Sequence, residues 1–596
     1  ICLIWLLKIG WLIGGLTGFL SIFYSSIVRR EYRVKCEVKL GLDRISKAYF
    51  YLEDLASALI DYPFSTLMLL FALGFLAPIA AHLARKRKNK LLSILVFTGF
   101  LWGILWFARL GWKLAFLLIP PLASYSSVAR YLRSSGEKPV IFKTPYSKLV
   151  FTLLIVHTLI FSAILFRVDV IVNPDNAYHT LISKLISEKG FFLWDEVQFA
   201  PTGRPHLYPP FYHFLVAVMG NALGGESWSY IHANTLVSIL VYATGMYLAW
   251  YLGRELYGCL GGLVTFLLAS GSLLTSFSMV IGLPSTLVFI LAPTAGLLAI
   301  KGEKNKAVIA STTAMYSHTS GVPIISITLL VSGFLSGKFR ENLKILLSSL
   351  ILFSPWLLRL ILFYKWFNIP EHDVRARIDF YLLGLAIPGL ILCLKEPRKN
   401  SVQIGYAASL IPVFLTYPGR AVIQGGFAFS LLAAKTVLKL LSKVRKHFRA
   451  ALALFAIITY VFPLQISAPI LEAALLVSPE KFKGVTWSKA EEIANALMTV
   501  AKPGEIIHFQ RSDLGCAVAV FADIRLDGGM WVETAPVDTG ARIGKNVRLI
   551  VLLETLEVPD ILSEAFKPVK TGENYLIIKV NPEKLKRELV PPLLLE

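Results

Sequence analysis

Residues Lys148–Phe166 read KLVFTLLIVHTLIFSAILF, and the polar stretch RVDVIVNPDNAYH follows directly at Arg167–His179. An apolar run of this length can cross about 30 Å of hydrocarbon as an α-helix. Lipid cannot hydrogen-bond free backbone groups, so a spanning segment must be a helix or part of a closed barrel. The apolar runs of the chain lack the strict alternation of barrel strands. We therefore predict an α-helical polytopic membrane protein.

Similar apolar runs on both sides of this stretch predict about fifteen spans. The expected spans are Ile1–Tyr24, Tyr62–Leu83, Leu91–Phe107, Lys113–Tyr131, Lys148–Phe166, Tyr230–Tyr251, Cys259–Leu274, Ile281–Ile300, Ala307–Tyr316, Gly321–Leu335, Leu343–Tyr364, Phe380–Leu394, Val402–Thr416, Phe427–Leu440 and Ala450–Ile470. Composition agrees, because the 596 residues are 55% hydrophobic and only 16% charged. A soluble protein of this size would carry more charge.

The formal net charge of +22 comes from basic residues that lie between apolar runs rather than on one soluble face. Lys and Arg concentrate in the cytoplasmic loops of membrane proteins. Counting spans places these basic loops on one side: Arg85–Lys90, Arg130–Lys148, Lys301–Lys306, Lys338–Lys344, Lys395–Lys399 and Lys443–Arg449. Arg29–Lys39 is basic but falls on the other side of the count. The pattern suits contact with anionic membrane lipids and argues against a nucleic-acid partner.

Three regions are expected along the chain. Residues 1–145 form an N-terminal transmembrane extension, residues 146–475 a transmembrane domain, and residues 476–596 a small α/β domain. Trp106–Leu132 and Tyr417–Leu440 share a layout, an Arg followed by an apolar helix with a basic end, so the extension is either a partial repeat or a chance likeness. The span count places the loop 167–213 and the C-terminal domain together on the extracytoplasmic side of the cell membrane.

The periodicity of the C-terminal domain predicts one helix and several short strands. The helix is expected at Trp487–Val500. The strands are expected at Gly504–Phe509, Ala517–Asp523, Val547–Leu553 and Tyr575–Val580.

The loop 167–213 is rich in side chains that carry chemistry. Asp175, Asp195 and Glu196 can accept a proton or bind a divalent cation. His179, His206 and His213 can shuttle protons or bind metal. Arg204 presents a planar fork of donors that suits a phosphate. An amphipathic stretch, Thr180–Lys189, is expected to lie along the membrane surface. A solvated loop with an aromatic membrane anchor remains the alternative reading of most of these residues.

Three motifs of this loop carry a family resemblance. NPDNAYH begins at Asn173, the pattern G-x-x-x-W-D begins at Gly190, and P-x-G-R-P-x-x-Y-P-P-x-Y-H begins at Pro201. Together they resemble the first external loop of the GT-C superfamily of membrane glycosyltransferases. The likeness is closest to the catalytic subunits of oligosaccharyltransferases, especially archaeal ones. It covers roughly residues 146–596, with the loop as its specific part.

The resemblance implies a sugar or glycan donor linked to a polyprenyl or dolichyl phosphate or diphosphate, and a glycan or protein acceptor at the outer membrane face. It implies that Asp175 is the catalytic acidic residue. Arg420 matches a family Arg that contacts the donor phosphate, with an interfacial side chain as the alternative. Arg204 is expected to bind the same phosphate. His179, Asp195, Glu196 and His206 would support acid–base chemistry or acceptor binding. The family often uses a divalent metal, so Mg²⁺ or Mn²⁺ on Asp175 and His179 is expected as an option.

The sequence departs from the oligosaccharyltransferase pattern in two places. Ser285 stands where the family has a second acidic residue, which puts a two-carboxylate metal site in doubt. The tail lacks the family's WWDYG signature, and Asp527–Glu533 is its nearest equivalent. These departures argue against Asn-X-Ser/Thr protein glycosylation.

Two other functions stay open. A transporter or lipid flippase would have paired charges at the membrane midplane and inverted repeats, which the sequence does not show clearly. A non-catalytic membrane subunit that keeps the fold is compatible with Ser285 and the missing tail signature. Arg359, inside the apolar run SPWLLRLILFYK, is either functional or an interfacial side chain, since charge inside a membrane is costly.

Overall fold

The structure, a computed structural model, describes the following residues: 146–165, 174–190, 194–272, 283–366, 380–416, 418–443, 452, 455–456, 486–529, 541–543, 545–553, 565–572, 575–581 and 583. The predicted extension 1–145, the possible repeat within it and most of the Ala450–Ile470 span lie outside the described residues.

Helices occupy the described part of every predicted span between Lys148 and Leu440. They are α7 (Ser147–Leu165), α10 (Ser227–Gly271), α12 (Ser285–Ile300), α13 (Lys304–Ser317), α14 (Gly321–Ser336), α15 (Phe339–Leu362), α16 (Phe380–Leu394), α17 (Ser401–Thr416) and α18 (Pro418–Lys443). Within the described residues, α10, α15 and the Gly425–Lys443 part of α18 are long and apolar enough to cross a membrane by length and composition. The total of about fifteen spans stays a prediction.

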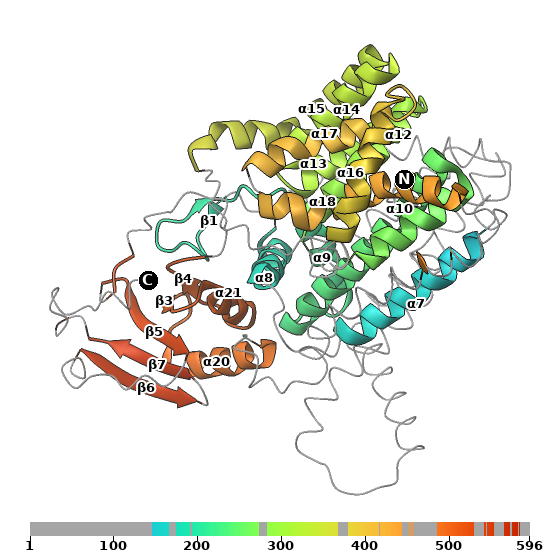
Figure 1. Ribbon diagram of the computed structural model, residues 1–596. Helices are drawn as coiled ribbons and strands as arrows, with labels where there is room; N and C mark the ends of the chain where they lie inside the picture. Colours follow the sequence, from blue (N-terminus) through green and yellow to red (C-terminus); the bar gives the residue numbers. More distant parts are fainter. Residues whose placement is uncertain are drawn as a thin grey trace, which may run out of the picture.

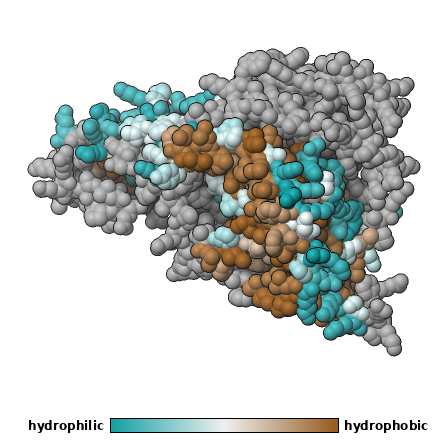
Figure 2. Space-filling model, turned by 90° about the horizontal axis from the view of Figure 1, so that it is seen from above, coloured by the Kyte–Doolittle hydropathy of each residue, from teal (hydrophilic) through white to brown (hydrophobic). Residues whose placement is uncertain are grey.

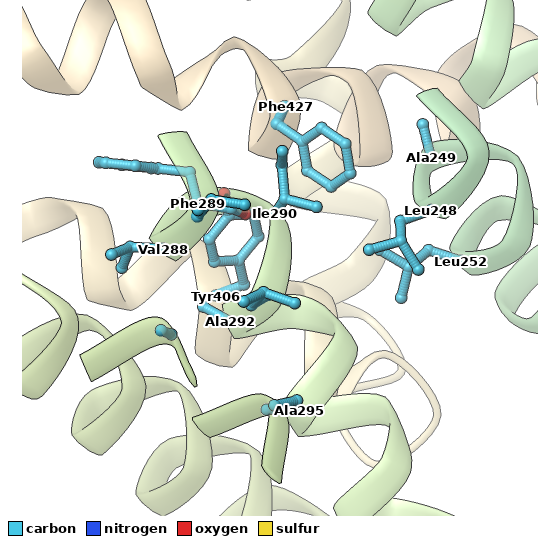
Figure 3. Close-up of a cluster of buried hydrophobic side chains, with 14 of the residues drawn as sticks. Leu248, Ala249, Leu252, Val288, Phe289, Ile290, Ala292, Ala295, Tyr406 and Phe427 are labelled. Atoms are coloured by element: carbon cyan, nitrogen blue, oxygen red, sulfur yellow. Dashed lines mark hydrogen bonds between the residues drawn. The ribbon is translucent and has the colours of Figure 1, made fainter. Parts of the chain in front are cut away.

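Helix α12 lies at the centre of the helical part, and every residue from Ser285 to Ala299 is buried. A helix that is hydrophobic all round suits such a position, because it has no face that needs water. Figure 3 shows its side chains packed between those of α10, α17 and α18. The Tyr406 hydroxyl of α17 donates to the Phe289 carbonyl of α12 at 2.6 Å, so this buried phenol has a hydrogen-bond partner.

The outer helices present apolar side chains to their surroundings. Phe334 of α14, Ile351 and Leu362 of α15, and Leu415 of α17 are all largely exposed. Figure 2 shows a broad hydrophobic face with hydrophilic side chains along its margins. A soluble monomer rarely exposes such an area, and the face therefore fits contact with lipid.

Helix α10 joins two predicted spans, Tyr230–Tyr251 and Cys259–Leu274, across a kink at Gly258. Gly258 has φ 81° and ψ −178°, a backbone conformation that is open essentially to glycine alone. The kink lets two consecutive helical segments pack against α9, α18 and α12 without an intervening loop.

The C-terminal domain is a five-stranded sheet with two helices packed on one face. The strands are β3 (Ile506–Phe509), β4 (Arg525–Leu526), β5 (Val547–Leu553), β6 (Phe566–Gly572) and β7 (Tyr575–Val580), in the order β4-β3-β5-β7-β6. Strands β4, β3 and β5 are parallel, whereas β7 is antiparallel to both β5 and β6. The helices are α20 (Trp487–Val500) and α21 (Ser512–Phe521).

Three of the four predicted strands and the predicted helix are confirmed. The strand predicted at Ala517–Asp523 is wrong, because Ala517–Phe521 complete helix α21 and Ala522 is the residue that ends it. Their run of buried small and apolar side chains has the composition of a buried strand, and short apolar runs do not separate the two possibilities. Strands β4 and β6 were not predicted. β4 has only two residues, which is too short to show alternation, and β6 is mostly polar.

The segment 174–222, which holds the described part of the loop 167–213, lies between the helical part and the C-terminal domain. It contains α8 (Pro174–Lys189), the hairpin β1 (Trp194–Asp195) and β2 (Arg204–Pro205), and α9 (Phe211–Ala222). Figure 1 shows α8 and α9 in the gap between α10 and the sheet domain, with α21 beside α8. The helix that carries Asp175 and His179 is therefore packed against the C-terminal domain on one side and against α9 and α10 on the other.

Candidate functional site

Helix α8 places Asp175 at the start of the site. Pro174 is the first residue of the helix, a position that its fixed φ favours, and Asp175 follows in the first turn. A carboxylate there is stabilised by the positive end of the helix dipole. Asp175 is partly exposed, unlike the five residues that follow Asn176. The predicted amphipathic stretch Thr180–Lys189 is thus helical, and its helix begins six residues earlier than expected. The expectation that it lies along the membrane surface is not met, because its apolar side chains pack against α21, α9 and α10.

A buried polar network anchors the first turn of α8 to α10. The Nδ2 atom of Asn234 donates to the Thr180 hydroxyl at 3.1 Å and to the Oδ1 and backbone O atoms of Asn176 at 3.3 and 3.4 Å. Its Oδ1 atom accepts from the Tyr212 hydroxyl of α9 at 2.7 Å. Because Asn176 is the neighbour of Asp175, the network fixes the backbone that carries the carboxylate.

Buried imidazole and phenol rings line the next turn of α8. The Nδ1 atom of His179 lies 2.9 Å from the Nε2 atom of His213, so one ring donates a hydrogen bond to the other. The Tyr208 ring packs edge-on against both, with centroids at 5.2 and 5.1 Å, and also against His318 at the end of α13. These contacts join α8, the end of the external loop, α9 and α13 in one rigid cluster.

His206 belongs to the same cluster. Its ring centroid lies 6.2 Å from that of His213. Burial lowers the pKa of His206 well below its usual value, and the nearby His213, Arg204 and Arg359 lower it further. The ring is therefore neutral at physiological pH, and it adds no positive charge to the site.

The β1–β2 hairpin pairs Asp195 with Arg204. The two residues face each other in the antiparallel register. The Oδ1 atom of Asp195 accepts from the backbone N–H of Gln198 at 3.0 Å, and its Oδ2 atom accepts from the Gln198 side chain at 2.8 Å. Burial raises the pKa of Asp195, while the Gln198 hydrogen bonds and the Arg204 charge oppose that shift.

Arg204 is a buried cation. Only 3% of its surface is exposed, and its guanidinium carbon lies 3.5 Å from the centroid of the Phe199 ring. Burial lowers the pKa of Arg204 to about 10, which leaves it charged at physiological pH. Tyr178 has its pKa raised well above the usual value by burial, and the charge of Arg204 opposes this shift. The charges of Asp195 and Asp175 act on Tyr178 in the opposite direction to that of Arg204.

Arg359 of α15 connects the helical part to the loop 167–213. Its Nε atom donates to the His206 carbonyl at 2.8 Å, and the Trp356 indole N–H donates to the Leu207 carbonyl at 3.2 Å. The guanidinium also lies over the rings of Trp356 and Phe363. Of the two readings of Arg359, these contacts favour a defined task for the charge, which is to hold the segment that leads into α9.

The structure brings most of the predicted site residues into one region. Asp175, His179, Asp195, Arg204 and His206 lie on α8 and the hairpin, which share the cluster described above. Their exposure differs: Asp175 is partly exposed, the other four are buried, and Glu196 is exposed. Arg420 lies in the first turn of α18, and its side chain is outside the described part of the structure. The roles predicted for these residues stay predictions.

Three residues of the site were not predicted: Asn234, Tyr212 and Gln198. Asn234 gave no clear signal, because the start of α10 reads SWSYIHANTL and already holds several other polar side chains. Gln198 gave no signal, since a Gln in a polar loop is ordinary until its partners on both sides are known.

The metal predicted on Asp175 and His179 finds little support from the surrounding side chains. Among the described residues, no group of three or more His, Cys, Asp or Glu side chains could hold a metal ion. The Nδ1 atom of His179 is also engaged with His213. Ser285, at the position expected to be acidic, begins α12 and is buried. The metal therefore stays a prediction, and no chemical step below depends on it.

Solved structures share the fold. ArnT from Cupriavidus metallidurans aligns with TM-scores of 0.51 in the apo state and 0.50 bound to undecaprenyl phosphate, at 15% and 14% sequence identity. Each alignment covers 73% of this chain and 98% of ArnT. The oligosaccharyltransferase of Archaeoglobus fulgidus tethered with an acceptor peptide aligns at 12% identity over 71% of this chain and 70% of that chain, with a TM-score of 0.48. No protein-family model and no curated protein sequence matches the chain. The expected GT-C resemblance is thus confirmed at the level of the fold.

Proposed function

We propose, starting from the fold shared with ArnT, that this protein is a glycosyltransferase of the GT-C type. It would move a sugar or glycan from a polyprenyl or dolichyl phosphate or diphosphate to an acceptor at the membrane surface. One observation carries the proposal: a partly exposed carboxylate, Asp175, opens helix α8 in a fold that ArnT shares over 98% of its length. The solved ArnT structure holds undecaprenyl phosphate, which supports a lipid-linked donor.

The proposed chemistry assigns the proton to Asp175. The acceptor's hydroxyl or amide group attacks the anomeric carbon of the donor, and a new glycosidic bond forms. The bond between that carbon and the phosphate oxygen breaks, and the lipid phosphate leaves with the electron pair. Asp175 accepts the acceptor's proton as general base. The N-terminal end of α8, where it lies, would also favour the negative charge that develops on the leaving phosphate.

Arg204 contributes a fixed positive charge to this step. In the described arrangement its guanidinium is buried over Phe199, so it acts on an anionic donor through its field rather than by direct contact. Direct binding of the donor phosphate by Arg204 requires the hairpin to shift. Arg420, at the start of α18, remains the proposed direct ligand. Glu196 lies between the two strands of the hairpin and is exposed, so it can reach a ligand without a shift of the hairpin. We propose that it faces the acceptor.

The test uses the full chain reconstituted in liposomes. A panel of polyprenyl- and dolichyl-phosphate sugars labelled in the sugar is added with candidate glycan and peptide acceptors. Glycosyl transfer predicts that lipid phosphate is released together with a labelled acceptor. Movement of intact donor across the bilayer without any release would instead establish a flippase. Donor binding with neither outcome would identify a non-catalytic subunit.

A further inference from the structure

The C-terminal domain is joined to the external loop by backbone hydrogen bonds. β4 is an edge strand of the sheet, with β3 on one side. On its other side the Leu526 N–H donates to the Val197 carbonyl at 2.7 Å, and the Ala200 N–H donates to the Leu526 carbonyl at 2.8 Å. The segment between β1 and β2 therefore covers the open edge of the sheet. Covering an edge in this way removes unpaired backbone groups from solvent.

Side chains continue the connection into the site. The Cys516 thiol of α21 lies 3.2 Å from the Oε1 atom of Gln198, to which it donates. The amide group of Gln198 in turn donates to Asp195, which faces Arg204 across the hairpin. Gln198 and Cys516 are both fully buried. A chain of three contacts thus runs from the C-terminal domain to the buried cation.

The same helix α21 also packs on the helix that carries Asp175. Ala177, Leu181 and Leu185 of α8 belong to one buried apolar cluster with the side chains of α20 and α21. Helix α8 therefore lies between the C-terminal domain on one face and α9 and α10 on the other, as Figure 1 shows. A shift of the domain would move α8 and the hairpin together.

We infer that the C-terminal domain helps to form the donor site. Gln198 is the positioning residue through which this domain fixes the Asp195–Arg204 pair. The consequence for catalysis rests on the proposed function. Gln198 does this because it presents opposite ends of one amide to the two domains: its carbonyl accepts from Cys516, and its N–H donates to Asp195. A side chain with only one of these capacities cannot replace it.

The inference is tested with Gln198→Leu, which keeps most of the side-chain volume and removes both hydrogen bonds. The matched control is Ser227→Ala. The Ser227 hydroxyl donates to the Val520 carbonyl of α21 at 2.6 Å, so it crosses the same junction without touching the hairpin. Donor KM and kcat are measured for each full-length variant in liposomes. Hydrogen exchange of the peptide covering residues 194–206 is measured without donor.

Gln198→Leu is expected to raise the donor KM and the exchange rate of this peptide by about tenfold, with a much smaller change in kcat, since two buried hydrogen bonds are lost. Ser227→Ala is expected to change neither quantity by more than about twofold. Cys516→Ser keeps a donor and should resemble the wild type in both, whereas Cys516→Ala should fall between.

Equal effects of Gln198→Leu and Ser227→Ala would overturn the inference, because the junction would then be acting only as general support. Unchanged exchange in Gln198→Leu would overturn it as well. If the wild type turns over no lipid-linked donor, the proposed function fails, while the exchange comparison still decides whether Gln198 positions the hairpin.

Discussion

Asn234→Leu is the substitution that probes the anchoring of Asp175 most sharply. It keeps a side chain of similar size and removes every hydrogen bond of the amide. The donations to Thr180 at 3.1 Å and to Asn176 at 3.3 and 3.4 Å are lost, and the Tyr212 hydroxyl loses its 2.7 Å acceptor. A buried hydrogen bond contributes about 1 kcal/mol, and a buried polar group left unsatisfied costs about 1–3 kcal/mol. Ser238, whose hydroxyl lies 3.2 Å from that of Tyr212, recovers part of the loss.

The first turns of α8 should therefore lose about 3 kcal/mol of local stability, which corresponds to roughly a hundredfold faster local opening. Hydrogen exchange of the peptide covering residues 177–189 measures this directly in detergent or liposomes. Ser183→Ala is the matched control, because the Ser183 hydroxyl bonds only the His179 carbonyl of its own helix at 2.6 Å. It should leave exchange within about twofold of the wild type.

Two results would refute this reasoning. If exchange in residues 177–189 is unchanged in Asn234→Leu, the network does not anchor α8. If exchange rises equally in α8, α9 and the start of α10, the substitution has loosened the fold as a whole, and the amide has no particular relation to the first turn.

Three further predictions concern stability and the loop. Burial raises the pKa of Glu491 from 4.5 to about 7, so its contribution to stability is complete below pH 4.5 and is lost as the pH rises through 7. At pH 8, Glu491→Gln should therefore have a free energy of unfolding about 1 kcal/mol above that of the wild type, after allowance for solvent screening. At pH 4.5 the two proteins should be equally stable. Equal stability at pH 8 would contradict this prediction. Gly258→Ala should cost about 1–3 kcal/mol at φ 81°, whereas Gly384→Ala, inside α16 with open space, should be neutral or stabilising in thermal melts. Arg359→Met should speed hydrogen exchange of residues 204–208 by about tenfold through loss of its 2.8 Å hydrogen bond, and unchanged exchange would remove its proposed task.

The sequence predicts the helical part well, because a span depends on a continuous apolar run that any window of residues reveals. The run of Ser285–Ile300 is an example, since it carries no charged side chain and its residues from Ser285 to Ala299 are all buried. The two spans around Gly258 were predicted as separate helices, and the structure has two helical segments that meet at Gly258, where φ is 81°. The sequence did not predict that the turn between them would be this short. The turn depends on the backbone dihedral angles of Gly258, and a hydropathy profile carries no information about these angles.

The candidate site could be predicted only in part. Asp175 was found because its motif places a carboxylate directly after a span, and Asp195 and Arg204 because the loop is rich in charge. The partners that fix them are distant in sequence: Asn234 is 58 residues from Asn176, and Cys516 is 318 residues from Gln198. No local pattern records such a pairing. Likewise, the burial of Arg204 over Phe199 depends on the packing of the folded chain, and its residue type alone suggested a phosphate ligand.

The most direct test of the account is the single-turnover rate of Asp175→Asn with a lipid-linked donor that the wild type uses. Donor binding is measured in parallel, with Glu196→Gln as a comparison at an exposed carboxylate nearby. If Asp175 accepts the acceptor's proton, the variant should bind donor within a few-fold of the wild type, and release of lipid phosphate should slow by about 10²–10⁴-fold. Release at more than about a tenth of the wild-type rate would contradict the role of this carboxylate as general base.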